Sequence, residues 1–390
     1  SGLVSFETRF VRLFFNDVAL DGTETGFVDQ GLYIWIEQPN RDFLVNHGLD
    51  PNGSIYKPNI FEFSPRYAAL RSEADPLYDQ EAYEDVIKPM SSPDHEKLME
   101  MLYAVNDYGR DYREVFNTYF DEENYLTWMA VNILFGNTDT LTHNMLLYSP
   151  AGSDKWHFLP WDYDEAMNYN EVYRWGNRYY QQFGIHYFWS VPLHQRYFRI
   201  EGNAQKLSAK MNELLSTTFT RQNFEQLSLG YRAVLDIFMA RQPDIGMARL
   251  VEDEAEMPLE DEAEDSLSDL QFAQAFRQRY TDTLNARYQA VLNNAERYEV
   301  TLQYPSSIFM QEPEKTDDGW LFRWDASFDH QRDRLTYEFI LSTGYTKKLA
   351  VVWEGYEQSG VLFHKTGLTD TSIIVPSLPE GPIFYRVLVH

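Results

Sequence analysis

The chain has 390 residues, of which 44% are hydrophobic, so it can bury a large core and form two or three domains. Sixty acidic residues against 33 basic ones give a formal net charge of -27, which argues against a nucleic acid as the main partner. The absence of cysteine excludes disulfides and thiolate zinc sites, and no apolar run approaches the roughly 20 residues of a membrane-spanning helix.

The first predicted elements are strands. Residues 9–15 (RFVRLFF) and 31–37 (GLYIWIE) are rich in β-branched and aromatic residues, and the segment between them is full of turn formers. We therefore expect the chain to begin with a pair of β-strands. A further strand is predicted at 53–57 (GSIYK), where Pro58 stops it. Residues 1–10 lack the charged start and apolar centre of a signal peptide.

A helical pattern follows from about residue 79 to 135. In its last part Asp121 is the expected N-cap, and Gly136 stands where a C-terminal cap glycine belongs. The apolar residues between them fall on one helical face, namely Leu126, Met129, Ala130, Ile133 and Leu134. Next, NMLLY and KWHFLP predict a hairpin across the turn SPAGSD.

The second half begins with helices and ends with strands. Residues 266–297 predict a helix with a core-facing stripe of Leu270, Ala273, Phe276, Tyr280, Leu284 and Val291. Before it, nine of the fourteen residues in 252–265 are acidic and none is basic, which predicts a solvated loop. From residue 300 the runs YEVTLQY, GWLFRWDA, LTYEFILST, KLAVVWEG, SIIVPSL and IFYRVLV predict a β-sandwich of immunoglobulin-like size.

The loop after the first long helix carries residues suited to phosphoryl transfer. That reaction needs a lysine on the phosphates, a carboxylate for the attacking hydroxyl and oxygen ligands for Mg²⁺. Asp139 and Asn144 have the Asp-x-x-x-x-Asn spacing of protein kinases, and Asp162 leaves the second strand of the following hairpin. Each residue alone is a weak signal, since acids after a helix are usually turn residues. Their order together favours a catalytic loop.

Several neighbours allow two interpretations. Lys57 is either the phosphate-contacting lysine or a surface lysine. Glu37 either pairs with a lysine or a metal, or forms a strand-end salt bridge. Trp156 and Tyr148 either stack on an adenine ring or belong to the core. His143 is either a general base or a loop histidine with one local hydrogen bond.

Four segments together resemble the CotH kinase-like family of spore-coat and secreted atypical kinases: GLYIWIEQPNRDFL, GSIYK, GNTDTLTHNMLLY and WHFLPWDYD. The resemblance is close over residues 9–170 and looser to about 300. It implies an α+β, protein-kinase-like fold in which Asp139 is the catalytic residue. By the same match Asn144, Asp162 and Asp164 are Mg²⁺ ligands, and Lys57, Trp156 and Glu37 belong to the nucleotide site.

The resemblance also implies a function and a domain plan. We expect an atypical protein kinase that uses ATP with Mg²⁺ or Mn²⁺, acts on a serine or threonine of a protein substrate, and is secreted or held at the cell surface. Residues 1–299 form the expected kinase-like domain and 300–390 a fibronectin type III-like sandwich. Family members carry an upstream Arg-Gly-x-Ser segment that this chain lacks, so its amino-terminal lobe is expected to be incomplete. The sequence contains no Gly-x-Gly-x-x-Gly motif, the glycine-rich loop that covers the phosphates of ATP in protein kinases.

Two other functions compete with the kinase. One is a pseudokinase or adhesion module that binds nucleotide or a partner protein without catalysis. The other is a glycoside hydrolase with Asp162 and Asp164 as paired carboxylates, about 7 Å apart on one strand. The hydrolase ranks lower, because it gives Asn144 and Lys57 no role. The patterns identify neither the phosphate acceptor nor the transferred group, phosphoryl or nucleotidyl.

Overall fold

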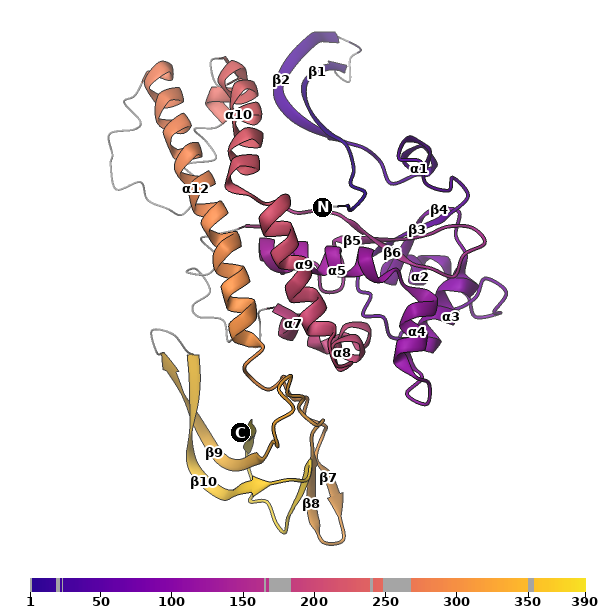
Figure 1. Cartoon of the computed structure of the whole chain (residues 1–390), viewed down its shortest axis with the longest axis vertical. Coiled ribbons are helices and arrows are strands. Elements are labelled where there is room, and N and C mark those ends of the chain that lie inside the picture. Colours follow the sequence, from indigo (N-terminus) through magenta and orange to yellow (C-terminus); the bar gives the residue numbers. More distant parts are fainter. Residues whose placement is uncertain are drawn as a thin grey trace.

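The computed structural model describes residues 2–18, 22, 24–164, 166–167, 184–238, 241–247, 268–349 and 354–390. Over these residues the chain is mixed α and β, with several small antiparallel sheets (Figure 1). The predicted acidic loop at 252–265 lies outside the described residues, as does the middle of the predicted strand KLAVVWEG. Within the part that is described, no helix has both the length and the apolar character needed to cross a membrane.

The chain begins with the expected antiparallel hairpin, β1 (Thr8–Val18) and β2 (Glu24–Ile36). In Figure 1 the hairpin stands apart from the other sheets, next to helix α10 (Arg221–Phe238). A bulge in the pairing falls at Gly31, whose φ is +86°. A Cβ at this position would lie 2.5 Å from Asp244 Oδ1, so glycine lets the hairpin approach this aspartate without displacing it.

A four-stranded antiparallel sheet has the order β4-β3-β5-β6. Strands β3 (Ser54–Pro58), β5 (Met145–Ser149) and β6 (His157–Pro160) confirm the predicted strand and hairpin. Strand β4 (Ile87–Ser91) lies inside the stretch that we predicted to be helical, so that part was wrong. Its pairing with β3 is long-range, and Pro89 is tolerated because β4 is an edge strand.

Helices α1 (Arg41–Asn46), α2 (Gln80–Val86), α3 (His95–Asn106) and α4 (Tyr112–Tyr119) precede the central helix α5 (Glu122–Phe135). Both predicted caps of α5 are present. The Asp121 side chain accepts a hydrogen bond from the Asn124 amide, and Gly136 is left-handed at φ 60°. The expected single apolar face was too narrow, because every residue from Tyr125 to Leu134 is buried. Such all-round burial marks a helix at the centre of a core.

Among the described residues, the further helices are α7 (Gly184–Tyr187), η2 (Phe188–Ser190), α8 (Pro192–Phe198), α9 (Asn203–Thr217), α10 and α12 (Asp269–Thr301). The predicted stripe of α12 is only partly core: Ala273 and Val291 are buried, whereas Phe276, Tyr280 and Leu284 are half-buried. The run YEVTLQY, predicted as a strand, is mostly the end of α12. Tyr298 explains this, because the helix places its ring in the main core and its hydroxyl on the Ala204 carbonyl.

The final part is all β. One three-stranded sheet has the order β10-β9-β12 and the other β11-β8-β7, formed by β7 (Glu314–Thr316), β8 (Gly319–Arg323), β9 (Tyr337–Leu349), β10 (Glu354–Leu368), β11 (Ser372–Val375) and β12 (Phe384–Val389). Strands of both sheets supply one cluster of buried residues. Its fibronectin type III identity and the boundary at residue 300 stay predictions.

Candidate functional site

The candidate catalytic loop leaves the core directly after α5. Gly136 ends the helix, and the Asn137 amide donates to the Asn132 carbonyl over 2.9 Å. The two asparagine side chains also bond to each other within the core, at 3.1 Å. The loop that carries Asp139 therefore starts from a fixed and hydrogen-bonded position.

Each carboxylate oxygen of Asp139 is hydrogen-bonded to a different neighbouring side chain. His143 Nε2 lies 2.8 Å from Oδ1, and the Asn144 side-chain amide donates to Oδ2 over 2.5 Å. The Asp139 side chain keeps 36% of its surface exposed. A carboxylate held in one orientation and open to solvent meets the first requirement for a group that positions or deprotonates a substrate hydroxyl.

Two candidate metal ligands have unusual backbones. Asn144 and Asp162, at φ 51° and 55°, are two of the six non-glycine residues with positive φ in the described part of the chain. Asn and Asp adopt this region more readily than other residues, yet it still has a free-energy cost. Strained positions of this kind concentrate at functional sites.

Asp162 and Asp164 influence each other. Burial and the neighbouring charge of Asp164 raise the pKa of Asp162, Asp139 adds to the rise, and Lys57 opposes it. The charges of Asp164, Asp139 and Lys57 therefore all act on Asp162. Both Asp162 and Asp164 are exposed, and they lie in the loop after β6 rather than on one strand. The strand geometry assumed for the glycoside hydrolase is therefore wrong.

Lys57 lies near the end of β3, with its ammonium 5.6 Å from the centre of the Trp161 ring. Across the described residues, it has no hydrogen bond and no ion pair within 4 Å. The positive charge of Lys57 acts on Asp162, where it opposes the rise in pKa. An ammonium group that has no ion pair among the described residues and lies near the Trp161 ring is available for a ligand phosphate.

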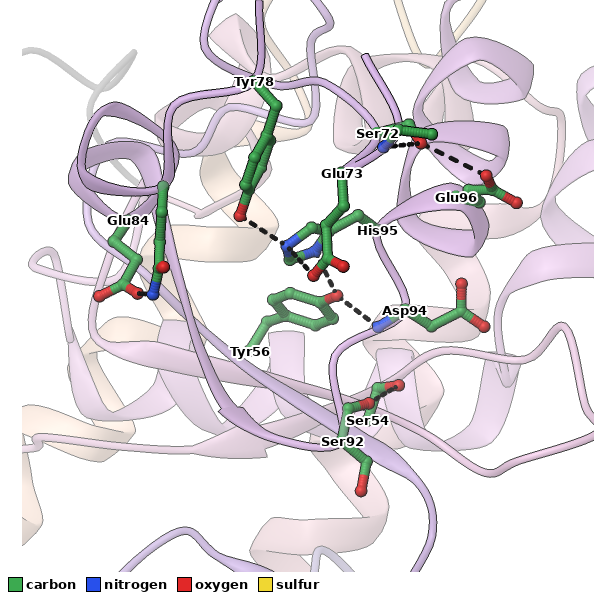
Figure 2. Close-up of polar contacts among 12 residues, drawn as sticks. Ser54, Tyr56, Ser72, Glu73, Tyr78, Glu84, Ser92, Asp94, His95 and Glu96 are labelled. Atoms are coloured by element: carbon green, nitrogen blue, oxygen red, sulfur yellow. Dashed lines mark hydrogen bonds and ion pairs between the residues drawn. The ribbon is translucent and has the colours of Figure 1, made fainter. Parts of the chain in front are cut away.

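The preceding residue, Tyr56, anchors this strand in the core, because side chains alternate along a strand. Its hydroxyl accepts from the Asp94 amide over 2.7 Å and lies 2.9 Å from His95 Nδ1 (Figure 2). Tyr56 therefore donates to Nδ1, which leaves the proton of neutral His95 on Nε2, facing the Tyr78 hydroxyl at 3.2 Å. This network fixes β3 to the start of α3 and so fixes the position of Lys57.

Trp156 and Tyr148 belong to the core in this structure. Trp156 is 0% exposed, with Tyr56 and Lys97 against its ring. Tyr148 is 3% exposed and accepts from the Asp50 amide. No ligand reaches either ring in this conformation. The half-exposed Trp161 was missed, although it stands directly before Asp162 in the motif PWDYD.

Glu37 is buried and has a local set of partners. It accepts from His47, from Asn46 and from the Glu7 amide, at 2.8, 3.0 and 3.2 Å. Burial by itself would raise the pKa of Glu37, but these hydrogen bonds outweigh it and the pKa is lowered. None of its partners in the described residues is a lysine, so Glu37 closes the hairpin base as the strand-end interpretation expected.

A cavity of about 660 Å³ adjoins the loop after β6. Its lining is mostly apolar and comes from the base of the hairpin, from that loop and from helices α10 and α12: Ser5, Phe6, Thr8, Arg9, Phe10, Ile34, Ile36, Pro160, Trp161, Asp162, Tyr163, Asp164, Tyr231, Leu235 and Tyr280. Its size lies within the range of small-molecule sites. Asp162 and Asp164 supply negative charge at its wall.

A divalent ion has no complete protein cage here. In the stretches that are described, no three His, Asp or Glu side chains come together as a metal site. Mg²⁺ usually keeps several waters and binds one or two carboxylates together with substrate phosphates. The coupled pair Asp162 and Asp164 fits that mode. The side-chain nitrogen of Asn144 donates a hydrogen bond to Asp139, so its side-chain oxygen is available to bind the ion.

Comparison with protein families identifies a match over most of the chain. The family model described as "CotH kinase protein" matches residues 1–281, which include every residue assigned here to the candidate site. No curated protein matches the chain.

Proposed function

Because the chain belongs to the CotH kinase family, we propose that it is an atypical protein kinase that transfers the γ-phosphate of ATP to serine or threonine hydroxyls of a protein. The observation that carries this proposal is Asp139, an accessible carboxylate held by His143 and Asn144 beside Asp162, Asp164 and Lys57. This is the set of groups that phosphoryl transfer requires. A secreted or cell-surface location belongs to the same proposal.

Asp139 receives the acceptor hydroxyl in this proposal. One of its oxygens accepts the hydrogen bond of that hydroxyl and aims it at the phosphorus. His143 and Asn144 restrict the rotation of the carboxylate, so little orientation is lost when the substrate arrives. A positioned carboxylate of this kind contributes roughly 10² to 10⁴ in rate.

Lys57 and the 660 Å³ cavity receive the nucleotide. The apolar lining, with Trp161 at its edge, suits the flat adenine, and Lys57 lies where its charge can meet a phosphate. Asp162 and Asp164, with Asn144, would hold Mg²⁺ or Mn²⁺. A bound divalent ion would neutralise phosphate charge and also favour ionised Asp162, whose pKa is otherwise raised.

A second candidate is a binding module without catalysis. It is supported by the hairpin, which exposes an unusual number of large apolar side chains: Val11, Leu13, Phe14, Phe15, Phe27, Val28, Tyr33, Ile34, Trp35 and Ile36. Exposed apolar area of this extent is typical of an interaction surface. This candidate accounts for the hairpin but gives no role to the oriented Asp139.

The experiment that separates the two measures nucleotide binding and phosphate transfer in the same preparation. A kinase should melt at a higher temperature with ATP only when Mg²⁺ or Mn²⁺ is present, and it should transfer labelled phosphate to a protein acceptor. The test variant is Lys57→Met, and its matched control is Lys88→Met. The two lysines are paired with each other across strands β3 and β4. Only Lys57→Met should weaken the shift. Binding without any transfer would favour the binding module.

A further inference from the structure

A second cavity, of about 560 Å³, lies where α4 and α8 meet the chain after β8. It shares no lining residue with the cavity beside Asp162. Its wall consists of Tyr108, Tyr112, Gln195, Arg196, Arg199, Ile200, Asp325 and Ala326. Two guanidinium groups and one carboxylate give this wall a positive charge, in a chain whose net charge is -27.

Arg196 is fixed in place without a counter-ion. It is 8% exposed, and it donates to the carbonyls of Val105 and Asp107 over 2.6 and 3.0 Å. Its guanidinium lies 4.2 Å from the centre of the Tyr112 ring and 4.5 Å from that of Tyr108. No described carboxylate lies within 4 Å of it. The group is therefore a rigid positive charge.

Arg199 is also without a counter-ion in the described residues. One of its terminal nitrogens donates to the Ala326 carbonyl over 3.1 Å, and its buried Nε has no partner. The guanidinium packs near the rings of Trp189 and Phe328. Arg12 shows the usual alternative, because its partly enclosed guanidinium has Asp29 and Asp244 as counter-ions.

Two further arginines contact the pair, Arg110 through its backbone and Arg332 through its side chain. Arg110 offers its carbonyl to Arg196, and Arg332 donates to the carbonyl of Arg199, each over 3.4 Å. Neither has an ion pair in the described part of the chain. Enclosing cationic groups costs free energy unless an anion compensates them. Here the only carboxylate in the wall is the exposed Asp325, which is not within 4 Å of either arginine.

We infer that this cavity binds a phosphate monoester, the group carried by a phosphorylated serine or threonine. The guanidinium donors of Arg196 and Arg199 that no backbone carbonyl accepts can meet phosphate oxygens, and the two charges match a dianion. The cavity also has room for residues next to the phosphorylated one. This is a recognition site and not a second catalytic centre, and it does not depend on the proposed kinase activity.

The test is calorimetric titration of the whole chain, without nucleotide, with a neutral peptide that contains one phosphoserine. Its unphosphorylated twin and inorganic phosphate are titrated in parallel. The phosphopeptide should bind, its twin should not, and added salt should weaken binding. Arg199→Gln should weaken binding about tenfold or more, since it removes a charged hydrogen-bond donor. Asp325→Asn should strengthen it by removing the opposing charge.

Arg287→Gln is the matched control, because it makes the same charge change on an exposed face of α12. It should leave the affinity unchanged. Binding of inorganic phosphate as tight as that of the peptide would support the site and assign it to free phosphate. Equal binding of the two peptides, no binding at all, or no response to both Arg199→Gln and Asp325→Asn would overturn the inference.

Discussion

At the scale of single residues, the proposed chemistry depends on groups close together in sequence. His143 and Asn144 come from the same loop as Asp139, four and five positions later, and each bonds one carboxylate oxygen. Asp162 and Asp164 are likewise two positions apart and already interact electrostatically. Short loops can therefore assemble most of the site, and only Lys57 must come from a distant strand.

The pair of carboxylates gives a pH-dependent prediction. Since the folded chain holds the Asp162 proton more tightly than the unfolded chain does, ionising Asp162 lowers stability as pH rises. Asp164→Asn removes the like charge, so it should raise the free energy of unfolding at pH 7 by at most about 1 kcal/mol, because both groups are exposed. The gain should vanish below the ordinary Asp pKa of about 3.9, where Asp162 is protonated in both states.

Urea unfolding at pH 7 and pH 3, without divalent ions, measures this effect. The control is Asp370→Asn, which makes the same charge change on the C-terminal part of the chain. High salt should reduce the gain. A gain of equal size at both pH values would mean that Asp164 acts on stability by another route.

At the scale of elements, α5 and its end determine where the Asp139 loop begins. Gly136 is left-handed, and the Asn294 side chain from α12 donates to the Leu134 carbonyl next to it over 3.1 Å. A Cβ on residue 136 would lie 2.9 Å from that Asn294 nitrogen. The helix end is therefore defined both by backbone conformation and by contact with α12.

Gly136→Ala should lower the free energy of unfolding by roughly 1 to 2 kcal/mol, because alanine is strained in the left-handed region. It should also reduce phosphate transfer, since it displaces the start of the catalytic loop. Gly48→Ala is the matched variant: its φ is +67° and its Cβ would meet nothing within 4 Å. It should show a similar loss of stability with normal transfer. Equal transfer by both variants would contradict this role for α5.

Elements governed by local chemistry were predictable. The caps of α5, the hairpin β5–β6 and strand β3 follow from Asp, Gly, Pro and alternating apolar residues. Strand β4 was not predictable, because it exists through its pairing with β3. The end of α12 was misjudged for a similar reason, since Tyr298 gains burial only when the whole core is assembled.

The same limit applies to the site. The motif residues Asp139, Asn144 and Asp162 were identified by spacing. In the structure, the Asn144 side chain donates a hydrogen bond to Asp139, and the charge of Asp139 contributes to the raised pKa of Asp162. Trp156 and Trp161 could not be told apart by residue type. Only packing decides that Trp156 fills the core while Trp161 remains half-exposed near Lys57. The four arginines at the second cavity, Arg110, Arg196, Arg199 and Arg332, come from three separate segments and form no sequence motif.

At the scale of the whole molecule, the large core and the core of the C-terminal part are separate clusters of buried residues. The large core joins the four-stranded sheet to helices α2 to α5, α8, α9 and α12, and a smaller one lies between the two C-terminal sheets. The segment after β8 connects the two parts: the Gln331 side chain donates to the Leu302 carbonyl, and Phe328 stacks on Trp189. A part with its own core can fold on its own.

Residues 303–390, expressed alone, should therefore fold cooperatively with a strand signal in circular dichroism. Their melting temperature should fall below that of the same part in the full chain, because the Phe328 contact is lost. Phe328→Ala in the full chain reproduces the loss without cutting the chain. A fragment without strand signal would show that the C-terminal part depends on the rest, and that the predicted boundary is wrong.

The central claim assigns different tasks to two carboxylates, and parallel assays of Asp139→Asn and Asp162→Asn test it most directly. ATP binding is titrated with Mg²⁺ or Mn²⁺, and labelled-phosphate transfer to a protein acceptor is measured on the same samples. Asp139→Asn should bind ATP normally and lose transfer by a factor of roughly 10² to 10⁴. Asp162→Asn should lose both binding and transfer, because it removes a metal ligand. If neither variant changes either quantity, Asp139 and Asp162 are turn residues and the assignment is wrong.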